Sequence, residues 1–206
     1  MKVYETEGFP NPARVRIALA EKGLTENVTF VPVDVMGGAH RAPDFLEKNP
    51  TGTVPVLELA DDTCISECSA ITEYLDHLDG DPTLTGRTAI ERGTIGMMQR
   101  RVEAGLLDAV ANYFHHATPG LGPDLETDQN PAWGEREKGK AVKTMRYLDK
   151  VLGAQDYVAG ERFTVADITA IAGLAFAGFA KIAIPDELTA LKAWHERVQA
   201  RPSVAA

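Results

Sequence analysis

Two neighbouring stretches of the chain carry residues whose types and spacing suit the binding of a small acidic peptide. The first runs from Asn49 to Pro55 as a turn and continues into an apolar pair, Val56-Leu57. Proline has no N–H to donate to a sheet ladder, so Pro55 is expected at the first residue of a strand or at a bend. An X-Pro bond can also be cis, which would leave the N–H and C=O of Val54 free for a peptide-like ligand.

The second stretch predicts the start of a helix. Polar Ser66-Glu67-Cys68-Ser69 is followed by apolar residues at positions i, i+3, i+4 and i+7, namely Ile71, Tyr74, Leu75 and Leu78. This spacing is typical of a helix that faces a core. A helix N-terminus has unpaired N–H groups and a partial positive charge, so it can hold a carboxylate. One stretch therefore offers peptide-type hydrogen bonds and the other an anion site.

Both stretches resemble motifs of the glutathione transferase superfamily. Val54-Pro55 resembles the family's cis-proline turn, which pairs with the cysteinyl backbone of glutathione. Glu67-Cys68-Ser69-Ala70-Ile71 resembles the Glu-Ser-x-Ala-Ile motif that holds the γ-glutamyl carboxylate. The resemblance implies that Glu67 accepts from the γ-glutamyl ammonium group; the alternative is a helix-capping role.

Cys68 stands where the motif has serine. A thiol is a weak donor, so its side-chain contact is expected to be weaker while the backbone N–H contact is kept. Cys68 is alternatively a buried small hydrophobic residue or, at a helix N-terminus, a reactive thiol.

A third segment, Gly38 to Leu46, resembles the Gly-x-His-x-x-Pro-x-Phe-Leu segment of plant-type members. The resemblance implies that His40 meets the glycine carboxylate of glutathione and that the hydroxyl of Thr53 touches the same end of the peptide. The alternative for His40 is a histidine on a surface loop.

The family's reaction needs a thiolate, whereas a free thiol titrates near about 8.5. One hydrogen bond to a charged acceptor, worth roughly 1.5–3 kcal/mol, lowers that pKa by about one to two units. Phe9-Pro10-Asn11 resembles the family's Ser-Pro-Asn segment, but Phe9 stands at the position of the activating serine and cannot donate. We therefore expect the amide of Asn11 to be the donor, with Thr6 and Tyr4 as lesser candidates, of which Tyr4 is alternatively a strand residue packed in the core. The alternative for Asn11 is to cap the first helix, since Pro12 suits the first helical position.

The second substrate is expected to meet apolar residues. Phe9 would form a wall beside the sulfur, and Tyr113 and Phe114 lie near the end of the first long helix after residue 87, where family members build their hydrophobic pocket. Tyr113 and Phe114 are equally compatible with a place in the core.

The elements that must position these residues fall into two parts. Residues 1–79 have the order β-α-β-α-β-β-α of an α/β thioredoxin-like N-terminal domain, and residues 80–86 form a linker. Residues 87–206 lack strand signals and predict an all-α C-terminal helical domain, which together with the first part is the glutathione transferase architecture. Within it, Thr164 and Asp167 have the spacing of a capping box, with Phe163 placed as a hydrophobic staple.

Composition excludes several classes of function. A formal net charge of −9 argues against nucleic acid and anionic membranes as partners. There is no apolar run of about 18 residues that would predict a membrane span. Two cysteines, Cys64 and Cys68, do not make a disulfide framework, which favours a reduced, cytoplasmic protein. The five histidines show no metal-ligand spacing, so no metal is expected.

We therefore expect a homodimeric glutathione transferase that uses glutathione as a co-substrate, needs no cofactor and acts on hydrophobic electrophiles or peroxides. Two alternatives stay open. One is a glutathione-binding protein without catalytic activity, which the absence of the usual serine makes credible. The other is a glutathione-dependent thiol oxidoreductase that works through Cys68.

Overall fold

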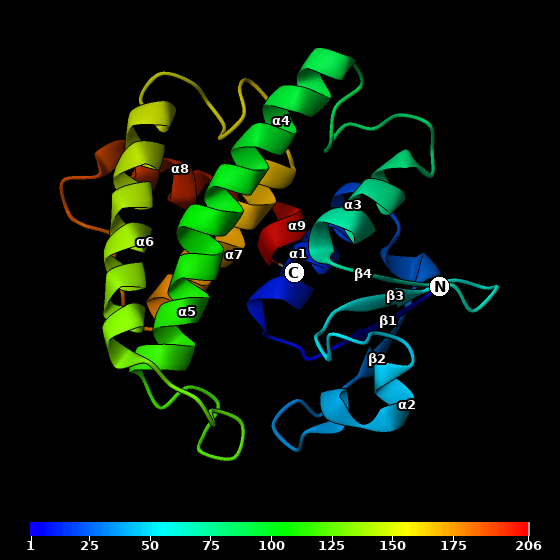
Figure 1. The fold of residues 1–206 in the computed structure, drawn as a ribbon. Coiled ribbons are helices and arrows are strands. Elements are labelled where there is room, and N and C mark those ends of the chain that lie inside the picture. The colour runs from blue at the N-terminus through cyan, green and yellow to red at the C-terminus, as the bar shows by residue number, and fades with distance from the viewer. Residues whose placement is uncertain (206) are drawn as a thin grey trace. The chain divides into compact units, whose positions relative to one another are not determined.

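A computed structural model describes residues 1–205 and divides into two compact units, one from Met1 to Leu84 and one from Thr85 onward (Figure 1). The first unit contains β1 (Lys2–Glu5), α1 (Pro10–Glu21), η1 (Thr25–Asn27), β2 (Thr29–Pro32), η2 (Ala39–Arg41), α2 (Pro43–Leu46), β3 (Val56–Glu58), β4 (Cys64–Ser66) and α3 (Cys68–His77). This order confirms the β-α-β-α-β-β-α arrangement predicted from the sequence.

The first unit is built on a four-stranded mixed sheet with strand order β2-β1-β3-β4. Strand β1 is parallel to β2 and antiparallel to β3, and β3 is antiparallel to β4. A parallel pair needs a crossover connection, which α1 supplies between β1 and β2. With helices packed on this mixed sheet, the unit has the predicted thioredoxin-like fold.

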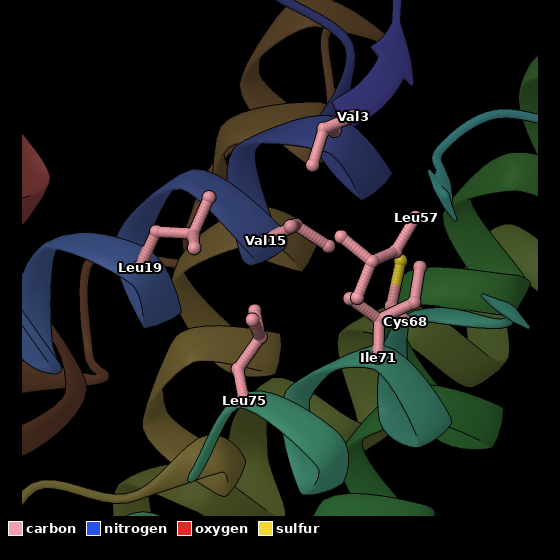
Figure 2. Close-up of a cluster of buried hydrophobic side chains, with 7 residues drawn as sticks. All are labelled: Val3, Val15, Leu19, Leu57, Cys68, Ile71 and Leu75. Carbon is pink, nitrogen blue, oxygen red and sulfur yellow. The ribbon is translucent and has the colours of Figure 1, made fainter. Parts of the chain in front are cut away.

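One face of the sheet carries the hydrophobic core of this unit. Val3 of β1 lies opposite Leu57 of β3, and both side chains are fully buried. Figure 2 shows them packed with residues of α1 and α3, which lie side by side. The cluster consists of Val3, Val15, Leu19, Leu57, Cys68, Ile71 and Leu75. Alternating strand residues point to opposite faces, so α1 and α3 cover the face of Val3 and Leu57.

The other face of the sheet carries a charged network. The ring of Tyr4 packs edge-on against Phe45 of α2, with ring centroids 6.4 Å apart. The Tyr4 hydroxyl donates to Oε2 of Glu58 at 2.8 Å, and Nζ of Lys48 donates to the same oxygen at 2.6 Å. Lys2 donates to the other carboxylate oxygen. Hydrogen bonds from Lys2, Lys48 and Tyr4 lower the pKa of Glu58 to about 2.

The second unit is helical. It contains α4 (Ala89–Val102), the π-helical turn η3 (Glu103–Leu107), α5 (Asp108–Ala117), α6 (Pro131–Leu152), α7 (Val165–Phe179), α8 (Thr189–Gln199) and α9 (Pro202–Ala205). Helix α7 is buried over most of its length and packs against α4, η3 and α5. Close packing at η3 depends on glycines, because a Cβ on Gly105 would lie 2.6 Å from Oγ1 of Thr144 and one on Gly173 would lie 2.8 Å from Cγ of Leu106.

The start of α7 has the capping box predicted from the sequence. Thr164 is the N-cap, its side chain bonds the first turn, and Asp167 bonds back to the N–H of Thr164 at 2.9 Å. The carboxylate of Asp167 also accepts from the N–H of Val158 at 2.9 Å and from Nε1 of Trp194 at 3.2 Å. Burial raises the pKa of Asp167 to about 6. A single carboxylate thus connects the start of α7 to α8.

No helix among residues 1–205 combines the length and the apolar character that crossing a bilayer requires.

We predict that Glu58→Gln lowers stability in a pH-dependent way. Because the pKa of Glu58 is depressed from about 4.5 to about 2, its stabilising effect is present above pH 4.5 and is lost as the pH falls towards 2. The urea midpoint of the variant should therefore lie below that of the wild type at pH 7, and the gap should narrow between pH 4.5 and 2.

The matched control is Glu187→Gln, which breaks an exposed ion pair with Arg146. Exposed pairs contribute little, so this change should leave the midpoint nearly unaltered. A difference in urea midpoint between wild type and Glu58→Gln that stays constant over the whole pH range would contradict the lowered pKa of Glu58.

Candidate functional site

The strand register brings four segments to one edge of the sheet. Val56, near the start of β3, pairs with Tyr4 near the end of β1 and with Ser66 at the end of β4. Glu5 pairs with Pro32, so the end of β2 lies in the same row. The loops that follow β1 and β2, the turn that precedes β3 and the helix that follows β4 therefore meet at this edge, and they carry the residues that the sequence predicts for binding and chemistry.

The turn before β3 offers backbone hydrogen-bonding groups. The Val54-Pro55 peptide bond is cis, as the sequence resemblance implies. Val54 is partly exposed, and within residues 1–205 neither its N–H nor its C=O has a hydrogen-bond partner. A peptide-like ligand can pair with this residue as an added strand would.

The helix after β4 offers an anion site. Glu67 is the N-cap of α3 and is exposed, and its φ of 68° and ψ of 117° are unusual for a residue other than glycine. Backbone outliers of this kind concentrate at functional sites. The N–H groups of Ser69 and Ala70, in the first turn of α3, have no hydrogen-bond partner in the described chain. They can donate to a carboxylate at the positive end of the helix.

Cys68 lies in the core, where its side chain is 5 % exposed. Figure 2 shows it in the same apolar cluster as Leu57 and Ile71. The thiol donates to the backbone carbonyl of Asn11 at 3.4 Å and thereby links the start of α3 to the start of α1. This placement suits a structural side chain, and it leaves the backbone of the α3 start as the part of the motif that could meet a ligand.

Asn11 holds a spare hydrogen-bond donor. Its Oδ1 accepts from Nη1 of Arg14 at 3.0 Å. Arginine has donors only, so this contact fixes which end of the amide faces Arg14 and leaves the NH₂ group for another acceptor. Nδ2 has no partner within residues 1–205, and the residue is exposed. The alternative role of Asn11 as a helix cap is wrong: α1 starts at Pro10, its N-cap is Phe9, and no side chain caps it.

The other two residues of this loop are less suited to donate to a sulfur. The hydroxyl of Thr6 donates to the backbone carbonyl of Val33 at 2.7 Å, so its proton is already used to join the ends of β1 and β2. Phe9 is partly buried at the start of α1. It has no polar atom in its side chain and can contribute only an apolar surface.

His40 lies in η2 and is only 7 % exposed. Its Nδ1 is buried without a hydrogen-bond partner in the described structure. Burial, together with the charge of Arg41, lowers the pKa of His40, so the ring is neutral at pH 7. The alternative of a histidine on an exposed loop surface is wrong, because the ring is buried. A neutral imidazole has one N–H donor, which could serve a ligand.

Thr53 is exposed and its hydroxyl lies 3.0 Å from Nδ2 of Asn49. The pattern Asn-Pro-Thr-Gly predicts a turn, but it does not mark Asn49 as the centre of a hydrogen-bond network. Asparagine side chains often bond the backbone two residues ahead in such turns, and this tendency is the signal that points to Asn49.

The two predicted pocket residues of the second unit, Tyr113 and Phe114, are both partly buried on α5. Nζ of Lys138 lies 4.8 Å from the ring centroid of Tyr113. The ring of Phe114 lies 5.3 Å from Phe176 and 5.7 Å from Phe179. Phe179 is 72 % exposed, so these three rings form an aromatic cluster that reaches the surface of the second unit. The spacing of Phe176 and Phe179 on one helix face is the signal that could have added them.

Comparison with known proteins identifies the family of this chain. The family model described as the glutathione S-transferase N-terminal domain matches residues 10–78, and the one described as the C-terminal domain matches residues 110–202. Glutathione S-transferase 2 from Saccharomyces cerevisiae is 57% identical over 204 residues, covering 99% of this chain and 88% of the yeast protein.

Two solved structures are similar over the whole chain. The crystal structure of a glutathione S-transferase domain-containing protein from Marinobacter aquaeolei VT8 is 63% identical, with a TM-score of 0.97, and covers 99% of this chain and 100% of its own. The crystal structure of Gtt2 from Saccharomyces cerevisiae is 56% identical, with a TM-score of 0.98 and coverage of 100% and 99%. Both family models and both structures agree on one assignment. The chain belongs to the glutathione S-transferase family.

Proposed function

We propose that this chain is a glutathione transferase that activates the glutathione thiol with the side-chain amide of Asn11. Members of the family use glutathione as a co-substrate and need no cofactor. The observation that carries the proposal is the spare NH₂ group of Asn11, oriented by Arg14 at the sheet edge where the Val54 backbone and the start of α3 also meet. The cysteinyl backbone would pair with Val54, which places the sulfur near the loop after β1.

The two ends of the tripeptide find complementary groups at the same edge. The γ-glutamyl carboxylate would dock on the N–H groups at the start of α3, and the exposed carboxylate of Glu67 would accept from the neighbouring ammonium group. The glycine carboxylate would accept a hydrogen bond from His40 and approach the hydroxyl of Thr53. Because His40 is neutral, it contributes one N–H donor and no full positive charge.

The chemistry follows from holding a thiolate beside an electrophile. A donor to the sulfur favours the thiolate, whose lone pair attacks an electrophilic carbon and forms a thioether as the leaving group departs with the bonding electrons. With a peroxide, two glutathione molecules are oxidised to their disulfide and the peroxide is reduced to an alcohol and water. Phe9 would give a hydrophobic second substrate an apolar surface in the first unit. Tyr113 and Phe114 stay predicted pocket residues of the second unit.

A glutathione-binding protein without catalytic activity is the second candidate, because Phe9 occupies the position of the family's activating serine. The buried position of Cys68 argues against an oxidoreductase that works through this residue: a thiol with 5 % exposure is poorly accessible to a disulfide substrate. Cys64 and Cys68 form no disulfide in the described structure, which supports the proposed cytoplasmic location.

We predict that Asn11→Ala lowers kcat/KM for conjugation of glutathione to a chlorodinitrobenzene by about tenfold or more, since one hydrogen bond to a charged acceptor contributes roughly 1.5–3 kcal/mol. The apparent pKa in the pH–rate profile should rise. Asn11→Asp is the matched variant, because it keeps an acceptor for Arg14 but has no donor for a thiolate. It should lose at least as much activity as the alanine variant.

Unchanged kinetics in both Asn11 variants would refute the assigned donor. Tight glutathione binding by the wild type without turnover of any electrophile or peroxide would favour the binding protein. Activity that survives Asn11→Ala and disappears in Cys68→Ser would favour the oxidoreductase.

We predict that His40→Ala raises the dissociation constant for glutathione about tenfold, the loss expected for one hydrogen bond to a charged group. The value of kcat at saturating glutathione should change little, because His40 contacts the end of the peptide remote from the sulfur. Isothermal titration calorimetry measures the first quantity and steady-state kinetics the second.

The control is His77→Ala. His77 is exposed at the end of α3 remote from the sheet edge, so this variant should bind as the wild type does. A dissociation constant of His40→Ala for glutathione equal to that of the wild type would show that His40 does not contribute to the binding site.

We also propose a homodimer that uses the exposed face of α4. Ile90 and Met97 are 79 % and 43 % exposed, and Gly93 and Gly96 lie between them on the helix with open space beside them. Large exposed apolar side chains beside small residues allow close approach of a second copy.

We predict that light scattering gives a molar mass of twice one chain for the wild type. Met97→Lys should lower the measured mass to that of one chain.

Met36→Lys is the matched control, since Met36 is similarly exposed in the first unit. A wild-type mass equal to a single chain at micromolar concentration would overturn the dimer proposal, and dissociation by Met36→Lys alone would move the interface away from α4.

A further inference from the structure

Asn49 is a buried polar side chain whose hydrogen bonds are all directed to one short turn. It has no exposed surface. Its Nδ2 donates to the backbone carbonyl of Thr53 at 2.8 Å and contacts the Thr53 hydroxyl at 3.0 Å. Its Oδ1 accepts from the N–H of Thr51 at 3.2 Å and from the Thr51 hydroxyl at 2.9 Å. Both ends of the amide therefore hold the chain that leads directly to Val54.

The same turn is fitted against the segment that carries His40. The N–H of Gly52 donates to the carbonyl of Asn49 at 3.0 Å, and Gly52 has a φ of 61°. A Cβ at this position would lie 3.2 Å from the backbone oxygen of His40 and 3.3 Å from Cδ2 of Leu46. The turn thus lies directly on η2 and α2. The turn therefore contacts the segment that carries His40 and also leads into Val54, and both residues are predicted to contact glutathione.

The residue before Asn49 is anchored independently. Nζ of Lys48 bonds Glu58 at 2.6 Å and lies 5.1 Å from the ring centroid of Tyr4. The entry to the turn is therefore tied to β1 and β3. Beyond Asn49, the side-chain hydrogen bonds of residues 50–53 in the described structure all lead back to Asn49 or join Thr51 to Thr53. Asn49 is the side chain on which the shape of this turn depends.

We propose that Asn49 is a positioning residue for glutathione: it holds the Val54 backbone and the His40 segment in their binding arrangement before the ligand arrives. This inference rests on the proposed function, because it concerns how the same site is held. A turn left free in the unliganded protein would have to be ordered on binding, and that entropy would be subtracted from the affinity. Loss of Asn49 should therefore weaken binding although Asn49 itself touches no part of the ligand.

The test compares Asn49→Ala with Asp76→Ala. Asp76 is also a buried polar side chain of the first unit, and it accepts the N–H of Leu84 and pairs with Lys22. It lies at the other end of α3, which at about 1.5 Å per residue is about 12 Å from the helix start. The two truncations remove comparable hydrogen bonding, one at the proposed site and one remote from it.

Isothermal titration calorimetry with reduced glutathione, at a temperature where circular dichroism shows each variant folded, should give a dissociation constant about tenfold higher for Asn49→Ala and unchanged for Asp76→Ala. At saturating glutathione, kcat of Asn49→Ala should stay within about twofold of the wild type, whereas KM for glutathione should rise in parallel with the dissociation constant. A general loosening of the fold would not separate KM from kcat in this way.

Thr51→Val keeps the proposal testable if Asn49→Ala does not fold. Thr51 is exposed, and this change removes the hydroxyl's bond to Oδ1 of Asn49 and its contact with the Thr53 hydroxyl, while the backbone bond remains. It should raise the dissociation constant about two- to threefold, and an unchanged value would then refute the proposal.

The remaining outcomes separate this inference from the function on which it rests. Glutathione binding by the wild type with an unaltered constant in Asn49→Ala would overturn the positioning role and leave the proposed function intact. Equal weakening by Asn49→Ala and Asp76→Ala would also overturn it, since the effect would not be specific to the turn. No binding by the wild type would refute the proposed function and this inference together.

Discussion

The pairing of Val56 with both Tyr4 and Ser66 is the constraint from which the site of the first unit follows. It sets the end of β1, the start of β3 and the end of β4 in one row, so three connections that are far apart in sequence leave the sheet together. A slip of one residue in either pairing would exchange the two faces of the strand. Leu57 would then leave the apolar cluster, and Glu58 would lose Tyr4 and the two lysines. The core and the charged network therefore fix the same register, and the register fixes the site.

The proposed site would bind an acidic peptide mainly through dipoles, although the protein itself is acidic. Its proposed donors are main-chain N–H groups at the start of α3, the backbone of Val54, a neutral imidazole and an amide. Dipoles held in place by the fold can stabilise a charge at short range, and they do not attract other anions from a distance as a basic patch would. The net charge of −9 and an anionic ligand are compatible for this reason.

Much of the fold follows from local patterns in the sequence. The spacing of Ile71, Tyr74 and Leu75 predicted α3, Thr164 and Asp167 predicted the start of α7, and the motifs around Pro55 and Glu67 led to the family that the comparisons confirm. The site could be predicted less well from the sequence, because hydrogen-bond partners depend on residues that meet only in the folded chain. The contact of Cys68 with the Asn11 carbonyl and the use of the Thr6 hydroxyl by Val33 are of this kind. The roles of Asn49 and of the aromatic cluster around Phe114 also depend on tertiary neighbours, which single-sequence patterns do not contain.

The π-helical turn η3 has a consequence for the long helical stretch that contains it. One extra residue per turn rotates everything that follows by about 100° relative to an uninterrupted α-helix, since each residue of an α-helix advances by that angle. The side chains of α5 are therefore rotated about the helix axis relative to the positions that a continuation of α4 would give them. In this rotated position Phe114 contacts Phe176. The extra residue in η3, rather than the identity of any aromatic residue, decides which side of the helix the α5 rings occupy. Related chains that lack the extra residue would present a different side chain at the place where Phe114 lies. A gap of one position in an alignment of this segment therefore indicates a rotation of the following helix and not a neutral change in loop length.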